Sequence, residues 1–71
     1  MVGMTQFGMK LFHSETKVIN GEEISVALGC FSNCYVVEYD GQVNYFMGRN
    51  KTSATQAKER YLWALNILRN A

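Results

Sequence analysis

The 71 residues of this chain suffice for one small domain at most. A composition of 48% hydrophobic and 18% charged residues is globular and excludes a wholly disordered chain. A formal net charge of only +1 argues against strong nonspecific binding to nucleic acid and against an acidic mimic of DNA.

The sequence predicts neither export nor insertion into a membrane. No apolar run approaches the ~20 residues of a membrane span, and residues 1–10 lack a basic region followed by a long apolar stretch. Two cysteines are ordinary for a reducing compartment. We therefore expect a cytoplasmic protein with a single domain over residues 1–71, in which residues 1–8, with two glycines and no clear period, are flexible.

The first predicted element is a β-hairpin. Alternating side chains from residue 9 onward predict a strand that leads into Asn20-Gly21, a strong hairpin signal. A two-residue loop would leave Val18 and Ile24 on opposite faces of the sheet. A three-residue loop over residues 19–21, with a bulge at the glycine, sets Thr16 opposite Ile24 and gathers the apolar positions on one face, so we prefer this register.

A second hairpin is predicted at Asp40-Gly41. We again prefer a three-residue loop, over residues 39–41, because it leaves only Val36 and Phe46 as apolar exceptions on the polar face. The residues grouped on the apolar face are Tyr35, Val37, Val43, Tyr45 and Met47. A tight turn predicted at residues 31–33 separates the hairpins and makes a four-stranded meander. If residues 24–39 run as one long bent strand, the sheet has three strands.

The last predicted element is a helix from about Ala54 to Asn70. Ser53, with Gln56 three residues later, has the form of a capping box, and Thr52 is an alternative cap. An apolar stripe follows at helical spacing: Ala57, Tyr61, Ala64, Leu65 and Leu68. Burying this stripe on the sheet predicts an α+β fold, a two-layer sandwich of a three- to four-stranded antiparallel meander and one C-terminal helix.

Side chains suited to catalysis or metal binding are few. By alternation the single histidine, His13, points off the apolar face, and no acid or cysteine is spaced to act with it. Cys30 and Cys34 flank the central turn, but two thiolates and one distant histidine do not complete a four-ligand zinc site within one chain, which leaves only a site shared between two chains. We expect no enzymatic activity, no cofactor and no metal.

Several large apolar side chains fall outside the helical stripe. Trp63 lies roughly 100° from it, with Ile67 beside it and Leu62 on the opposite flank. Phe31, Phe46 and Val36 are expected on the outer face of the sheet. Either a long N-terminal segment covers these side chains, or they form an exposed patch of the kind that marks an interface. The candidate interface residues are Trp63, Ile67, Leu62, Phe31 and Phe46.

The basic residues gather in the second half of the chain. Residues 1–40 hold two lysines against five acids, a charge of −3, whereas residues 41–71 hold five basic side chains against one acid, a charge of +4. The simplest interpretation is solvated surface. The alternative is a phosphate-binding site of Arg49, Lys51 and Lys58 around the start of the helix.

The order of strands, a Lys/Ser/Thr-rich connection and a helix containing Ala57-Lys58 is similar in layout to the C-terminal part of the double-stranded RNA-binding domain. The similarity covers residues 24–68. That family opens with a helix that this chain lacks, and its helix usually begins with consecutive lysines where this one has Ala54-Thr55. The resemblance is therefore one of layout and does not imply membership of that family.

These features predict a stand-alone protein-binding module that acts as an inhibitor, adaptor or regulator by occupying a partner surface. The expected partner is another protein or a second copy of the chain, which would form a homodimer. Small chains without catalytic chemistry are frequent products of phages and mobile elements, so a phage origin is an expectation from size and missing chemistry. A nucleic-acid-binding module is the alternative function, and a structural subunit of a larger assembly comes third.

Overall fold

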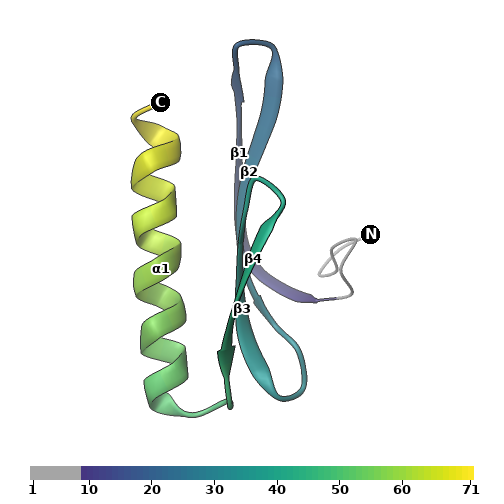
Figure 1. Cartoon of the computed structure of the whole chain (residues 1–71), viewed down its shortest axis with the longest axis vertical. Helices are drawn as coiled ribbons and strands as arrows, with labels where there is room; N and C mark the ends of the chain where they lie inside the picture. Colours follow the sequence, from purple (N-terminus) through teal and green to yellow (C-terminus); the bar gives the residue numbers. More distant parts are fainter. Residues whose placement is uncertain (1–8) are drawn as a thin grey trace.

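The computed structural model describes residues 9–71 and confirms the predicted α+β fold. Within the described residues, four antiparallel strands form one sheet in the order β1-β2-β3-β4, and a single helix covers one face of it (Figure 1). The elements are β1 (Lys10–Ile19), β2 (Glu22–Cys30), β3 (Cys34–Tyr39), β4 (Gln42–Met47) and α1 (Lys51–Arg69). Because residues 31–33 separate β2 from β3, the three-stranded alternative is wrong. The expected flexibility of residues 1–8 lies outside the described residues.

Both outer hairpins close with two-residue loops, so the predicted three-residue loops are wrong. The pairs that flank the loops are Ile19 with Glu22 and Tyr39 with Gln42. Asn20 and Gly21 have φ values of 52° and 82°, and Asp40 and Gly41 have 50° and 83°. Two successive residues with positive φ make a type I′ turn, whose twist matches that of the flanking strands. The loop length therefore follows the match between the twist of the turn and that of the strands, and it does not place all apolar side chains on one face.

This register divides the apolar residues between the two faces of the sheet. The helix-side core is built from the buried residues Val26, Val37, Ala57, Tyr61, Ala64, Leu65 and Leu68. A second cluster lies on the outer face and consists of the buried residues Met9, Ala27, Cys34 and Val36, with Leu11, Phe31 and Val43 packed against it.

The face of each residue in β3 and β4 follows from this register. Val36 and Phe31 lie on the outer face as predicted. Phe46 packs against the helix-side core instead, because it is the cross-strand partner of Tyr35, so its predicted place on the outer face is wrong. Tyr45 pairs with Val36 on the outer face, whereas Val37 lies on the helix side. The predicted grouping of Tyr35 and Val37 on one face with Val43, Tyr45 and Met47 is therefore also wrong.

Helix α1 begins at Lys51 with Asn50 as its N-cap, three residues before the predicted start. The Asn50 Oδ1 atom accepts a hydrogen bond of 2.9 Å from the Ser53 backbone N–H, and the Ser53 Oγ atom accepts one of 3.1 Å from the Asn50 backbone N–H. Asparagine is as good a cap as serine. Ser53 and Thr52 are therefore not the N-cap, and buried Ser53 occupies the third helical position of the capping box.

Strand β1 is irregular near its start and is tied to the end of the helix. A bulge between Leu11 and His13 breaks the alternation, so both Phe12 and His13 face the helix side. The His13 ring stacks on Tyr61 with 6.1 Å between ring centres. His13 is exposed as predicted, but its predicted direction, away from the helix-side core, is wrong.

No helix in the described residues has the length and apolar character needed to cross a membrane.

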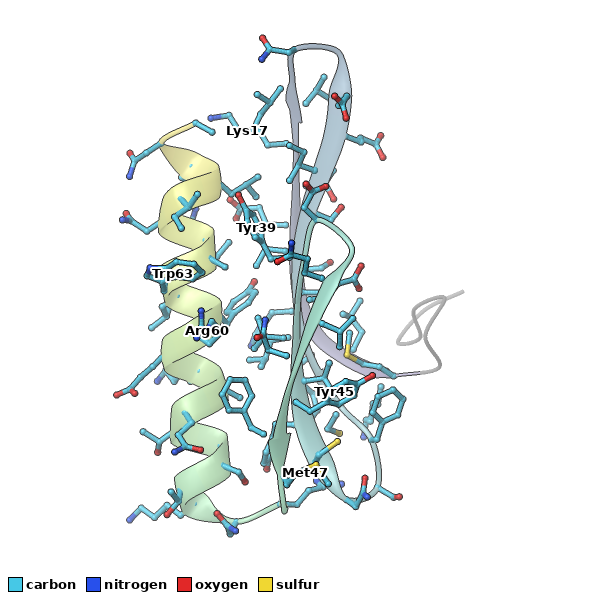
Figure 2. The ribbon with its side chains drawn as sticks, viewed as in Figure 1. Lys17, Tyr39, Tyr45, Met47, Arg60 and Trp63 are labelled. Atoms are coloured by element: carbon cyan, nitrogen blue, oxygen red, sulfur yellow. The ribbon has the colours of Figure 1, made fainter. Side chains whose placement is uncertain are left out.

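Two side chains of β1 hold the C-terminal end of the helix. The Lys17 Nζ atom donates hydrogen bonds to the backbone oxygens of Arg69 and Ala71, at 3.2 and 2.8 Å. Figure 2 shows Lys17 reaching from the sheet to this end of the helix. Arg69 in turn donates two hydrogen bonds of 2.8 Å to the Glu15 carboxylate. A cation near a helix C-terminus is stabilising, so Lys17 favours this docking of α1 on β1.

Candidate protein-binding surface

The solvent-facing side of α1 carries an exposed tryptophan. The Trp63 side chain is 53% exposed, and Ile67, one turn later, is 36% exposed. The Arg60 guanidinium lies over the Trp63 ring, with Cζ 4.8 Å from the ring centre, which is a cation–π contact (Figure 2). Arg60 thereby covers part of the ring without removing it from solvent.

Trp63 and Arg60 border a shallow depression of about 460 Å³ between α1 and β4, together with Phe46, Gln56 and Glu59. We call Phe46, Gln56, Glu59, Arg60, Trp63 and Ile67 the tryptophan surface. It contains three of the five predicted interface residues, Trp63, Ile67 and Phe46. Phe46 contributes from a half-buried position in the helix-side core, so it reaches this surface from the face opposite to the one predicted.

The remaining two predicted interface residues lie elsewhere. Leu62 is 52% exposed but points to the other flank of α1, into a groove of about 680 Å³ between the helix and β1. Phe31 lies on the outer face of the sheet, where its ring stacks on Tyr45 with 6.3 Å between ring centres. The five residues therefore occupy three separate places and do not form one patch.

The groove between α1 and β1 is mixed in character. Its apolar lining includes Phe12, Leu28, Tyr35, Leu62 and Leu65, and its polar lining includes His13, Glu15, Lys58 and Arg69. The Arg69 hydrogen bonds hold the pKa of the Glu15 carboxyl below its usual value, so Glu15 remains an ion-pair partner and not a proton acceptor. Burial raises the pKa of Tyr61, which keeps that phenol protonated. Among the described residues no group of three or more histidines, cysteines and acids is placed to hold a metal ion.

The predicted phosphate-binding residues are exposed and lie around the start of α1. The Arg49 guanidinium stacks on Tyr35, with Cζ 5.5 Å from the ring centre. Lys51 is the first residue of the helix, and Lys58 lines the groove that Tyr35 also lines. The first turn of α1 contains no acid. Tyr35 therefore contacts Arg49 and lines the same groove as Lys58. The sequence did not single out Tyr35 for this site, because its role depends on a neighbour in another element.

The two cysteines are free and buried. Cys30 is the cross-strand partner of Tyr35 and shares its face, whereas Cys34 packs in the outer cluster. Cross-strand partners place their side chains on the same face of a sheet, and neighbours along a strand alternate. The two thiols therefore lie on opposite sides of the sheet, although the sequence places them at both ends of one turn.

Beyond the tryptophan surface, apolar side chains are also exposed on the outer face of β4. Tyr45 is 56% and Met47 64% exposed, and in Figure 2 both point away from the helix. Sequence alternation alone did not reveal this, because the predicted register placed both side chains toward the core.

No model of a known protein family, no curated protein and no solved structure matches this chain.

Proposed function

We propose that this chain is a small protein-binding module that acts as an inhibitor, adaptor or regulator by covering part of a partner protein. The observation that carries the proposal is the exposure of two large apolar side chains of the tryptophan surface on α1, Trp63 and Ile67. Tryptophan and arginine are over-represented among the residues that dominate binding energy, and here Arg60 and Trp63 are in contact. A partner that covers Trp63 would therefore gain more binding free energy from this ring than from the charged side chains around it.

The contact between Arg60 and Trp63 also supports binding through this surface. A side chain that is already held in one conformation loses less entropy when a partner immobilises it. The proposed compartment is the cytoplasm, since two buried free thiols on opposite faces of the sheet suit a reducing environment.

The test is affinity capture from a nuclease-treated lysate of the organism that encodes the chain. The bait proteins are the wild type, Trp63→Ala and, as a matched control, Asn66→Ala, which removes another exposed side chain of α1. We expect a protein that the wild type and Asn66→Ala retain and that Trp63→Ala binds at least tenfold more weakly, because central tryptophans typically contribute ~2 kcal/mol or more. Equal retention by all three baits, with circular dichroism confirming their fold, would contradict the proposal.

A second candidate function is binding of nucleic acid through Arg49, Lys51 and Lys58. Its support is the exposure of all three cations around a helix start that has no acid in its first turn. We expect Lys51→Ala and Lys58→Ala to weaken binding of labelled RNA or DNA in fluorescence anisotropy, and affinity to fall steeply with salt. A chain that binds neither RNA nor DNA at low salt would eliminate this candidate.

A further inference from the structure

The two edge strands of the sheet differ in how they are protected. An exposed edge is a template for another strand, and proteins usually block it with charged side chains, proline or a bulge. Strand β1 has a bulge and three charged residues, Lys10, Glu15 and Lys17. Strand β4, with the sequence QVNYFM, has no charged residue, no proline and no register shift. In the described part of the chain β4 pairs only with β3.

The backbone groups that β4 offers at its free edge follow from its pairing with β3. The Gly48 N–H donates a hydrogen bond of 2.8 Å to the Asn33 carbonyl, so Gly48 belongs to a hydrogen-bonded pair. Such pairs alternate along an antiparallel ladder, which directs Gln42, Asn44 and Phe46 toward β3 as well. The N–H and C=O groups of the intervening residues, Val43, Tyr45 and Met47, therefore point to the free edge.

Apolar side chains flank this edge on both faces of the sheet. On the outer face Tyr45 and Met47 are more than half exposed. On the helix side the tryptophan surface begins at Phe46 and continues to Trp63. A strand added to β4 would thus bury apolar side chains on both of its faces in addition to satisfying the free backbone groups.

We propose that β4 is a strand-addition interface and that its partner is a second copy of this chain, paired antiparallel about a two-fold axis through Tyr45. Directly opposite residues in an antiparallel pair share a face of the sheet. A two-fold axis perpendicular to the sheet keeps the outer face of one copy beside the outer face of the other, so odd-numbered residues of β4 lie opposite odd-numbered residues of the second copy. Centring the pair on Tyr45 makes Tyr45 face Tyr45 of the second copy and makes Val43 face Met47 of the second copy. All three are residues whose backbone groups point outward.

The side chains of this register are self-complementary. The pair at the axis is aromatic with aromatic, which is a favourable cross-strand pair. The pairs beside it are aliphatic with aliphatic and remove apolar surface from water. The strand itself carries no charge, and the tryptophan surface holds one acid and one base, Glu59 and Arg60, so the two copies meet without net repulsion. Both helices lie on the same side of the joined eight-stranded sheet, with their tryptophan surfaces facing each other across the axis.

The first test measures the mass of the chain by light scattering or sedimentation as its concentration rises. We expect the mass to double, and Tyr45→Lys to keep the chain monomeric because two ammonium groups would face each other at the axis. The matched control is Val18→Lys, which adds the same charge to another apolar position that is more than half exposed, on β1 at the other edge. Met47→Lys is the second variant if loss of the Tyr45 ring impairs folding. A wild type that remains monomeric at millimolar concentration would overturn the proposal.

The second test identifies the interface by amide hydrogen exchange, and it needs no substitution. At low concentration the amides of Val43, Tyr45 and Met47 should exchange quickly, while those of Asn44 and Phe46 are protected by β3. At high concentration we expect all five amides to be protected, with the largest gain at Tyr45. A dimer in which Val43, Tyr45 and Met47 still exchange as they do in the monomer would show that the copies meet elsewhere, and the proposal would be wrong.

The inference rests on the proposed function in that it uses the same tryptophan surface, but the two fail separately. If the chain stays monomeric while Trp63→Ala still abolishes capture of a cellular protein, the second copy is excluded and the protein-binding module stands. If the dimer forms through β4 and no cellular protein is captured, the dimer stands and the proposed function is lost.

Discussion

Leu62 and Leu65 lie three residues apart on α1 in opposite environments. Leu65 is 7% exposed in the helix-side core, whereas Leu62 is 52% exposed at the mouth of the groove beside β1. We expect Leu65→Ala to cost about 2–5 kcal/mol of unfolding free energy and Leu62→Ala well under 1 kcal/mol. Denaturation midpoints of the two variants test this, and equal midpoints would mean that the helix packs on a different face.

Glu15 and Glu38 should respond to pH in opposite directions. Hydrogen bonds from Arg69 lower the pKa of Glu15, so its contribution to stability is present above the usual pKa of 4.5 and is lost as the pH falls through the lowered value. Burial raises the pKa of Glu38, so its contribution is present below pH 4.5 and is lost as the pH rises through the raised value.

Glutamine substitutions separate these two effects. We expect Glu15→Gln to destabilise the protein more at pH 7 than at pH 3, and Glu38→Gln to stabilise it at pH 7 only. Urea denaturation at both pH values measures the difference. Because the pair of Glu15 and Arg69 is exposed, 1 M NaCl should shrink the effect of Glu15→Gln at pH 7. An effect of the same size at pH 3 and pH 7 would rule out the ion pair as its cause.

At the scale of elements, the start of α1 depends on Asn50. Its side chain accepts the Ser53 N–H and is the only cap that the helix geometry identifies among the described residues. We expect Asn50→Ala to lower the unfolding free energy by about 1 kcal/mol and Thr52→Ala to change it by less than about 0.5 kcal/mol, since Thr52 is an exposed position inside the first turn. Thermal unfolding followed by circular dichroism compares them, and a larger loss for Thr52→Ala would return the cap to the position predicted from the sequence.

The strands were located correctly because alternation and turn residues are local properties of the chain. Their register was not, because two loop lengths were compatible with Asn20-Gly21 and with Asp40-Gly41. The loop length depends on which turn matches the twist of the strands it joins, and not on which turn places the apolar side chains on one face. This error moved Tyr45 and Met47 to the wrong face and concealed the apolar outer side of β4.

At the scale of the whole molecule, a helix and one small sheet leave a tryptophan in contact with solvent. Because Trp63 is 53% exposed, we expect its fluorescence in dilute solution to show long-wavelength emission and to be quenched readily by acrylamide. Pairing of two copies through β4 should shift the emission to shorter wavelength and reduce quenching as concentration rises. Short-wavelength emission that does not change with dilution would contradict the exposure of this ring.

The candidate site could be predicted from the sequence in part. Exposure of Trp63, Ile67 and Leu62 followed from their angles to the helical stripe, which is a property of one element. Their separation into two surfaces did not follow, since it depends on where β1 and β4 lie beside the helix. The contact of Arg49 with Tyr35 was also out of reach, because each residue belongs to a different part of the chain.

The sequence by itself determined the places of the two hairpins, the C-terminal helix that follows them and the stripe that this helix buries, but it was compatible with both three and four strands. These features depend on periodicity over a few residues, which short-range sterics and solvent exclusion impose on any such segment. Only the tertiary structure decided the register, the side of the helix that meets β4, the union of Glu15 with Arg69 and the position of uncharged β4 at an edge of the sheet. Each of these features depends on contacts between residues distant in the chain. Turn twist, the bulge of β1 and packing on both faces of the sheet together determine which of these contacts form.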